Sequence, residues 1–297
     1  MNRLKEYFSI KDLENLSGIK AHTLRVWEKR YNLLAPNRTD TNIRYYSLSH
    51  LQKLLNIVLL YKNGYKISRI ARFAEEKIPL LVREIASRKA VKHHYLNDFK
   101  LAMLHFDRAL FSETYNRLTA GKSFRRVFHE IFIPLLNELG MLWQTDTITP
   151  AHEHFITDLI KQKIIVNIEN LPTLPRQYTG KTFVLYLPEE EMHEIGLLYV
   201  HYELMLRKCH GIYLGQAVPI SGLKSIQLRY PEVTFISYFT VEPNKNKIDA
   251  YIEDFEKQID VSPPNALWLL GRQTAHLTRI PSFVRTFKGI DQLLKTL

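Results

Sequence analysis

A carboxylate, a histidine and a glycine lie close together in the segment Glu191-Met-His193-Glu-Ile-Gly196. A neutral imidazole is a good ligand for a borderline transition metal. A carboxylate two residues away can hold the proton of the other ring nitrogen, which fixes the tautomer and the basicity of the ligand. A lone histidine at the end of a strand is more often an ordinary surface residue, so the surrounding elements have to decide its role.

A second group that could contact a ligand lies upstream, at Trp143, Glu153 and His154. A tryptophan supplies a flat apolar wall, and a carboxylate accepts hydrogen bonds from hydroxyl groups such as those of a ribose. The alternative is that Trp143 belongs to a hydrophobic core and that residues 152–154 form the polar first turn of a helix. The residue types alone leave both interpretations open.

Residues 180–297 alternate between strand-like and helical patterns. The apolar runs KTFVLYLP, GIYLG, VTFISYF and ALWLLG are separated by amphipathic stretches and followed by a shorter strand–helix pair. This alternation predicts an open α/β sheet, which binds ligands at the carboxyl ends of its strands. Glu191 and His193 fall at such an end. A dinucleotide-binding fold is less expected, because no Gly-x-Gly-x-x-Gly follows the first strand.

The middle of the chain is predicted to be a bundle of four helices over residues 94–175. Amphipathic patterns occur at 94–106, 108–120, 123–144 and 149–171. Residues 77–93 are predicted to form a linker with some helix, because their lysine-rich composition favours exposure. The periodicity establishes helical content and leaves the role of the bundle open.

The positive charge is concentrated in the first quarter of the chain. The formal net charge is +11, and residues 1–75 hold 14 Lys or Arg against six Asp or Glu. Such a field attracts a polyanion and releases its counterions, so nucleic acid is the favoured partner and an anionic membrane surface the second. The residue pattern of this region favours DNA.

Composition also limits the class of protein. No apolar run is long enough for a transmembrane helix, and the charged N-terminal residues do not form a signal peptide, so we expect a cytoplasmic protein without a membrane partner. The single cysteine, Cys209, excludes an internal disulfide framework and a thiolate metal cluster within one chain.

Two short helices around a glycine turn are predicted for residues 9–31. Ser9 can cap the first helix, Gly18 can end it, and the second helix is predicted from about Lys20 to Tyr31. This pattern is typical of a helix-turn-helix, although a solvated basic face on a helical hairpin is the alternative. With Leu24 and Trp27 buried, the outward residues form a candidate recognition surface: His22, Thr23, Arg25, Val26 and Lys29.

The next segment predicts a hairpin wing followed by a helix. TDTN lies between two short segments that can pair, and Asn42 tolerates a positive φ. Ser47 or Ser49 can start the following helix. Three residues are expected to project from the hairpin, with the second suited to a phosphate or the minor groove: Arg38, Arg44 and Tyr46.

With both parts in view, the stretch TLRVWEKRYNLLAPNRTDTNIRYYSLSHLQKL closely resembles the DNA-binding domain of MerR-type transcriptional regulators. The resemblance covers about residues 6–76 and implies a winged helix-turn-helix over residues 1–76. It is most similar to the subgroup that carries a cobalamin-binding sensor. Asn32 and Asn42 stand at two glycine positions of the family, and asparagine is the residue best able to replace glycine in a left-handed turn.

The downstream motifs also resemble that subgroup. Trp143, nine intervening residues and then Glu153-His154 resemble the signature of the helical half of cobalamin-binding photoreceptors, which implies that the three residues surround an adenosyl group. Glu191-x-His193-x-x-Gly196 resembles the Asp-x-His-x-x-Gly element of cobalamin-binding domains. The resemblance implies that His193 is the lower axial ligand of cobalt in place of the cofactor's own base.

The same resemblance assigns further cofactor contacts. It implies that Gly196 opens space for the displaced nucleotide tail, that Gly215 belongs to the second-strand element, and that Ser237 faces the buried base. Gly271 stands at the first of two family glycines after the fourth strand. Together these elements imply adenosylcobalamin as the cofactor and a Rossmann-like, flavodoxin-like domain over residues 180–297.

Two departures from the family pattern affect the expected site. Arg272 replaces the second glycine and could pair with the nucleotide phosphate or crowd the tail. Gln144 stands where well-understood members have a histidine that binds cobalt after illumination. We therefore expect a photoproduct that is water-ligated or loses cobalamin more readily, unless His152 or His154 substitutes.

These features predict a DNA-binding transcriptional regulator, not an enzyme, that is similar to light-responsive repressors of the CarH and LitR type. The resemblance implies a homodimer or a ligand-dependent tetramer that occupies an operator in the dark, and dissociation once light cleaves the cobalt–carbon bond. One alternative is a cobalamin-independent regulator whose C-terminal domains serve dimerisation or partner-protein binding. A methyltransferase or mutase subunit is disfavoured, because the remaining residues form a DNA-binding domain.

Overall fold

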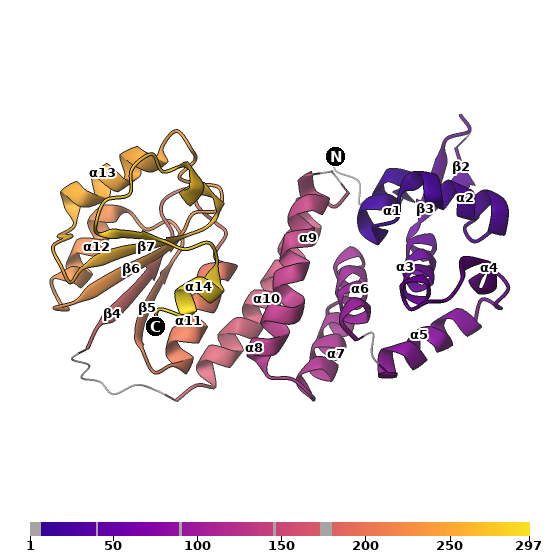
Figure 1. Cartoon of the computed structure of the whole chain (residues 1–297), viewed down its shortest axis with the longest axis horizontal. Coiled ribbons are helices and arrows are strands. Elements are labelled where there is room, and N and C mark those ends of the chain that lie inside the picture. Colours follow the sequence, from indigo (N-terminus) through magenta and orange to yellow (C-terminus); the bar gives the residue numbers. More distant parts are fainter. Residues whose placement is uncertain (1–6, 40, 89–90, 145–146, 173–179) are drawn as a thin grey trace. The chain divides into compact units, whose positions relative to one another are not determined.

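The computed structural model describes residues 7–39, 41–88, 91–144, 147–172 and 180–297 (Figure 1). The chain divides into two compact units, residues 1–159 and 160–297, and the boundary falls within helix α10. Over the described ranges, no helix combines the length and the apolar character that crossing a membrane requires.

The first unit begins with a small three-stranded sheet and a helix-turn-helix. Its strands are antiparallel in the order β1-β3-β2, and β2 and β3 form the predicted wing. The elements are β1 (Tyr7–Phe8), α1 (Ile10–Ser17), α2 (Ala21–Tyr31), β2 (Asn37–Arg38), β3 (Arg44–Ser47), α3 (Leu48–Lys62) and α4 (Ile67–Ile70).

Local capping explains where these helices begin and end. Ser9 accepts a hydrogen bond from the backbone of Asp12, whose side chain accepts one in return, so the two residues form a capping box. Gly18 ends α1 with φ +73°. Asn32 ends α2 with φ +50°, and Asn42 lies in the wing with φ +66°, which confirms that both asparagines take the left-handed conformation.

A helical bundle completes the first unit and agrees closely with the predicted helical stretches. Four fully buried phenylalanines, Phe99, Phe111, Phe128 and Phe132, lie in its core. The residues predicted as a linker begin with a helix, α5. The elements are α5 (Lys77–Arg88), α6 (Val91–Leu104), α7 (Arg108–Thr119), α8 (Phe124–Val127), a π-helical turn (Phe128–Phe132), α9 (Ile133–Gln144) and α10 (Pro150–Glu169).

The second unit is a parallel sheet with helices on both faces (Figure 1). The strand order is β5-β4-β6-β7-β8, the flavodoxin-like order, in which the direction of winding reverses beside β4. This confirms the predicted α/β fold. The elements are β4 (Thr182–Tyr186), α11 (Ile195–Leu206), β5 (His210–Gly215), α12 (Ile220–Gln227), β6 (Val233–Tyr238), α13 (Ile248–Gln258), β7 (Ala266–Leu270), a 3₁₀ turn (Arg272–His276), β8 (Val284–Thr286) and α14 (Ile290–Leu294).

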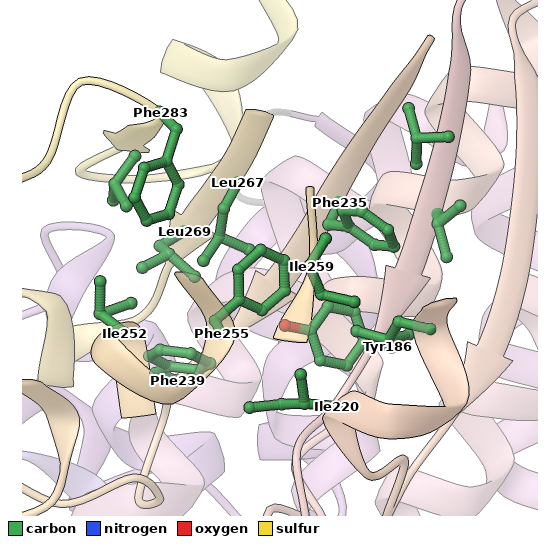
Figure 2. Packing of buried hydrophobic residues seen from close by; sticks show 14 of the residues in the cluster. Tyr186, Ile220, Phe235, Phe239, Ile252, Phe255, Ile259, Leu267, Leu269 and Phe283 are labelled. Atoms are coloured by element: carbon green, nitrogen blue, oxygen red, sulfur yellow. The ribbon is translucent and has the colours of Figure 1, made fainter. Parts of the chain in front are cut away.

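An aromatic core joins this sheet to helices α12 and α13 (Figure 2). Phe235 packs edge-to-face against Phe255 of α13, with ring centroids 5.5 Å apart. Tyr186 contacts the same cluster and bonds through its hydroxyl to that of Tyr251. Burial of each large apolar side chain contributes about 1.5–3 kcal/mol, so this core holds the strand ends that carry the site in place.

Gly271, at the end of β7, is predicted to be essential for stability. Its φ is +96°, and a Cβ there would lie 2.2 Å from the carbonyl oxygen of Phe239. Gly271→Ala should lower the free energy of unfolding by about 3 kcal/mol or more, since both the φ and the contact are unfavourable. Urea unfolding of the purified protein measures the effect.

The matched control is Gly222→Ala in α12, where no heavy atom lies closer than 4.0 Å to the new Cβ. This variant should be neutral or up to about 1 kcal/mol more stable, because alanine favours helix over glycine. Equal unfolding midpoints for the two variants would contradict the close approach at Gly271.

Candidate functional site

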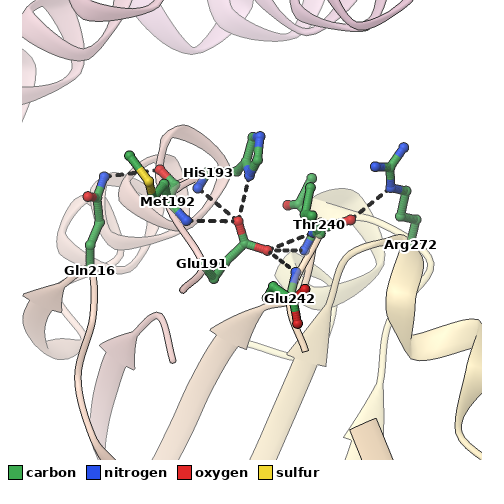
Figure 3. Close-up of polar contacts among 8 residues, drawn as sticks. Glu191, Met192, His193, Gln216, Thr240, Glu242 and Arg272 are labelled. Carbon is green, nitrogen blue, oxygen red and sulfur yellow. Dashed lines mark hydrogen bonds and ion pairs between the residues drawn. The ribbon is translucent and has the colours of Figure 1, made fainter. Parts of the chain in front are cut away.

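Glu191 is a buried carboxylate at the carboxyl end of β4, and its side chain is 0% exposed. Oε2 accepts hydrogen bonds from the backbone N–H groups of Thr240, Val241 and Glu242 at 2.9, 2.7 and 2.9 Å (Figure 3). Oε1 accepts from the N–H groups of Met192 and His193, both at 3.0 Å. The carboxylate thus joins the loops that follow β4 and β6.

The imidazole of His193 is the side chain that this carboxylate orients. Its Nδ1 donates to Oε1 of Glu191 over 2.5 Å, and the side chain is 53% exposed. Because Nδ1 is engaged by the carboxylate, a metal would be bound through Nε2. The structure therefore contains the carboxylate–imidazole pair that the sequence predicts, at the switch point of the sheet where such folds bind ligands.

The hydrogen bonds decide the ionisation of Glu191. Burial alone would raise the pKa of this carboxyl, but hydrogen bonds from the His193 imidazole and from the backbone of Val241, His193 and Glu242 lower the pKa to about 2. Glu191 is consequently ionised at neutral pH. A full negative charge beside Nδ1 increases the basicity of the other ring nitrogen.

Arg272 supports the loop that binds Glu191. Its Nε donates to the carbonyl oxygen of Thr240 over 2.7 Å (Figure 3). The N–H of Thr240 donates to Glu191, so one peptide segment connects the guanidinium to the buried carboxylate. Sequence reasoning considered Arg272 only as a partner or an obstacle for the nucleotide. Its position in the chain gave no signal for the loop contact.

A second buried carboxylate, Glu194, fixes the start of α11. Its Oε2 accepts a hydrogen bond from the hydroxyl of Tyr213 over 2.7 Å, and its Oε1 pairs with Nζ of Lys161 at 2.5 Å. Burial, together with Glu194, raises the pKa of the Tyr213 phenol well above its usual range. Sequence reasoning missed these residues, because their positions are 19 and 33 residues from Glu194 and no local pattern connects them.

The predicted cofactor glycines have identifiable backbone roles. Gly215 ends β5 with φ +81°, and its carbonyl accepts from the N–H of Leu187 over 2.8 Å. Gly196 lies against an aromatic ring, since a Cβ there would lie 2.8 Å from Cε2 of Tyr238. Gly271 lies against the backbone of Phe239. Each is a position where a side chain would not fit or would strain the backbone.

The resemblance implies that Ser237 faces the buried base of the cofactor, and this role stays a prediction. Ser237 is fully buried, and its Oγ donates to the carbonyl oxygen of Tyr186 over 2.8 Å. Its neighbours two residues away, Phe235 and Phe239, belong to the core against α12 and α13. Alternation along β6 therefore directs Ser237 away from α11, and the residue that meets Gly196 is Tyr238.

The upstream candidates lie at the end of α9 and the start of α10. The side chains of Trp143 and Gln144 lie outside the part of the chain that the structure describes. Glu153 is half-buried, and the side chain of His154 is 73% exposed, with Nε2 3.5 Å from Oε2 of Glu153. These two residues occupy the first turn of α10.

His152 differs from His154 in its surroundings. It is 3% exposed, its ring stacks on Phe106 with centroids 4.7 Å apart, and its Nδ1 lies 3.2 Å from the donating N–H nitrogen of Thr149. His152 thus holds the helix start within the core. Of the two histidines considered as substitutes for Gln144, exposure favours His154.

The recognition surface of α2 is oriented as predicted. Leu24 and Trp27 are buried in the core of the domain. Thr23 is half-buried, and the exposed face presents His22, Arg25, Val26 and Lys29. These four lie at i, i+3, i+4 and i+7, which places them on one side of the helix. On the wing, Arg38 and Arg44 are exposed.

The expectation that Tyr46 projects from the wing is wrong. Tyr46 is 0% exposed, and its hydroxyl donates to Oε1 of Glu28 in α2. Burial raises the pKa of the phenol, and the Glu28 carboxylate raises it further. Nε of Arg44 lies 3.9 Å from the other oxygen of Glu28. Tyr46 therefore packs the wing against α2 and does not project from the hairpin.

Over the described ranges, no three His, Cys, Asp or Glu side chains gather as a metal site. His193 with Glu191 instead offers a single oriented nitrogen, which suits one axial position of a metal that a cofactor already holds.

Comparison with known proteins matches two family models. Residues 8–77 match the MerR HTH family regulatory protein model, and residues 95–166 match the B12 binding domain model. The HTH-type transcriptional repressor CarH of Myxococcus xanthus is 28% identical over 214 residues, which are 70% of each chain. The repressor CarA of the same organism is 24% identical over 233 residues, 77% of this chain and 75% of CarA.

A solved structure shows similarity of fold. The monomethylamine corrinoid protein of Methanosarcina barkeri superposes with a TM-score of 0.53 at 11% identity, covering 69% of this chain and 97% of that one. At this identity the match concerns the fold alone.

Glu191→Gln is predicted to destabilise the second unit. An amide would place an N–H₂ group against backbone donors that now face a carboxylate, which should lower the free energy of unfolding by about 2–4 kcal/mol. The folded-state pKa of about 2 lies below the ordinary value of 4.5. The stabilisation by Glu191 is therefore complete above about pH 4.5 and is lost as the pH falls toward about 2.

Urea unfolding at a series of pH values tests both statements. Wild type should lose stability through this acidic window, and the Glu191→Gln variant should lose less. Glu189→Gln is the control, because Glu189 is exposed two residues away and its change should stay within about 0.5 kcal/mol. A Glu191→Gln protein as stable as wild type would show that the carboxylate charge is not required.

Proposed function

We propose that this chain, which carries a MerR-type helix-turn-helix and a B12 binding domain, is a transcriptional repressor controlled by adenosylcobalamin and light. One observation carries the proposal: an imidazole oriented by a buried carboxylate stands at the ligand-binding edge of a flavodoxin-like sheet, in a chain that begins with a winged helix-turn-helix. The relatives CarH and CarA are named as transcriptional repressors. No chemistry on a substrate is implied.

The DNA-binding role is assigned to the exposed face of α2 and the wing. Arg25 and Lys29 would contact phosphates or base edges in the major groove, with His22 and Val26 beside them. Arg44 would reach a phosphate or the minor groove from the wing. A buried Tyr46 supports this arrangement by holding the wing against the recognition helix.

The cofactor role is assigned to the edge of the sheet around His193. Nε2 of His193 would bind the cobalt of the cofactor, with Glu191 fixing the tautomer. Met192 is 67% exposed and Val241 38% exposed, and their apolar side chains suit the face of a corrin ring. Gly215 and Gly271 would shape the same edge. When bound, the cofactor supplies a cobalt–carbon bond that light can break.

The resemblance to cobalamin-binding photoreceptors gives the residues of the helical bundle a role toward the adenosyl group. Trp143 would form an apolar wall against the adenosyl group, and Glu153 would accept hydrogen bonds from its ribose. His154, exposed beside Glu153, would replace the missing histidine at Gln144. The resemblance to light-responsive repressors supports a dark form that is a dimer or tetramer bound to an operator.

The pair of Glu191 and His193 fits cobalamin, but one other observation does not fit this cofactor. The carboxylate–imidazole pair has the chemistry of a lower axial ligand, whereas the space beside Gly196 contains the ring of Tyr238. This second observation favours a cobalamin-independent regulator as the alternative function, with the second unit serving dimerisation or partner binding.

Arg25→Ala is predicted to weaken operator binding. Loss of one phosphate or base contact should reduce the affinity by about 1–3 kcal/mol and lower the slope of log K against log salt by about one. Fluorescence anisotropy on operator DNA at several salt concentrations measures both. Lys257→Ala removes the same charge from α13 and should change neither, so equal effects of the two variants would leave α2 without a specific role.

His193→Ala is predicted to abolish the histidine-ligated spectrum of bound adenosylcobalamin. The absorbance spectrum and the size-exclusion profile would be recorded in the dark and after green illumination. Wild type should show histidine ligation and a light-dependent change of assembly. His276→Ala, an exposed histidine of the same unit, is the control and should behave as wild type. Free elution of cobalamin from wild type would instead support the cobalamin-independent regulator.

A further inference from the structure

The ring of Tyr238 occupies the space beside Gly196, at the first turn of α11. An ideal Cβ at Gly196 would lie 2.8 Å from Cε2, 3.1 Å from Cζ and 3.2 Å from Cδ2 of this ring. A Cβ at these distances would force the ring to shift, so glycine lets the ring lie directly against the helix. Gly196 and Tyr238 are therefore a complementary pair.

The direction of β6 explains why Tyr238 holds this place. Successive side chains of a strand point to opposite faces of the sheet. Ser237 points into the core with α12 and α13, where its Oγ donates to Tyr186. Tyr238 consequently points to the face that α11 covers. Burial raises the pKa of its phenol, in agreement with a ring that is largely removed from water.

The chemistry of cobalamin makes this position important. When a protein imidazole takes the lower axial position, the cofactor's own base leaves cobalt and must be accommodated with its nucleotide tail. The resemblance of the Glu191–Gly196 segment to cobalamin-binding domains places that tail beside Gly196. In this chain a phenol ring fills the same space. The oriented imidazole of His193 is present, and the ring of Tyr238 lies where the tail would be accommodated.

We propose that Tyr238 determines which corrinoid this chain accepts, because its ring closes the site beside Gly196 to a nucleotide tail. A corrinoid without the tail binds at least as tightly as complete cobalamin. Complete cobalamin binds only with the ring displaced, which reduces its affinity. This inference rests on the proposed function, since it requires His193 to bind the cobalt of a corrinoid.

The test compares two corrinoids that share the corrin ring and differ in the tail, cyanocobalamin and cyanocobinamide. Each is titrated into the full-length apoprotein, and binding is followed by absorbance and equilibrium dialysis. Wild type should bind cyanocobinamide as tightly as cyanocobalamin or more tightly. Tyr238→Ser should raise the affinity for cyanocobalamin by about tenfold or more and leave cyanocobinamide unchanged.

A matched control removes a tyrosine elsewhere in the same unit. Tyr230 is half-buried and precedes β6, whereas Tyr238 is the last residue of that strand. Tyr230→Ser should therefore preserve the wild-type ratio of affinities. If both serine variants changed the ratio equally, the effect would be a general loss of packing and the inference would be overturned.

A second measurement needs no corrinoid. Gly196→Ala places a methyl group against the Tyr238 ring, so the apoprotein should lose about 4 °C or more in Tm. The same substitution in a Tyr238→Ser background should cost little, because the opposing ring is absent. Equal losses in both backgrounds would show that the ring does not lie against Gly196. If the serine variant does not fold, the wild-type affinity ratio and Gly196→Ala alone decide.

The outcomes separate this inference from the proposed function. A wild type that prefers cyanocobalamin about tenfold or more, with no change in the Tyr238→Ser protein, overturns the role of Tyr238 and leaves cobalamin control intact. If neither corrinoid binds to the wild type or to any variant, the result overturns the role of Tyr238 together with the proposed cofactor. If the Tyr238→Ser protein binds cyanocobalamin and the wild type does not, the result supports a tail site that the Tyr238 ring closes.

Discussion

The buried carboxylate of Glu191 is the interaction on which the candidate site depends. A charge removed from water is costly unless donors surround it, and here five backbone N–H groups and one imidazole do so. Those donors come from the loops after β4 and β6, so the carboxylate fixes two strand ends and one side chain together. The orientation of His193 is thereby determined by the protein before any ligand arrives, which is the condition for a well-defined axial ligand.

The residues around this carboxylate divide into those that support the His193 imidazole and those that shape the neighbouring surface. Arg272 binds the carbonyl of the peptide whose N–H binds Glu191, so the arginine at a family glycine position reinforces the loop. Tyr238 changes the space beside Gly196 instead. The residues that orient His193 differ from the residue that fills the space beside Gly196. These two features of the sheet edge can therefore vary separately.

The winged helix-turn-helix also contains a carboxylate, half-buried in this case, that receives a side chain from a neighbouring element. Glu28 of α2 accepts the hydroxyl of Tyr46 from the wing, while Arg44 of the same strand approaches from the exposed side. The wing is thus held against α2 by a buried tyrosine and a half-buried glutamate. Exposed basic residues on each element are left to contact DNA, where their charge is effective.

Much of the architecture follows from local sequence. Apolar periodicity indicated the bundle helices and the α/β alternation, and capping residues indicated where α1 and α2 begin and end, because these patterns depend on neighbours a few residues apart. The pair of Glu191 with His193 was predictable for the same reason, since the two residues are close neighbours in the chain. The left-handed asparagines were also predictable, from the conformational freedom of that residue type.

Other features depended on the tertiary structure. The burial of Tyr46, the contact of Arg272 with Thr240 and the partners of Glu194 join residues far apart in the chain, and no periodicity encodes such distances. For Ser237 and Tyr238 the decisive quantity was the register of β6, because a shift of one residue exchanges the two faces of a strand. The sequence by itself determined the α/β alternation, the outward face of α2 and the proximity of Glu191 to His193. Only the packed sheet decided that a tyrosine, and not a serine, faces Gly196, because side-chain direction is set by pairing with the neighbouring strands.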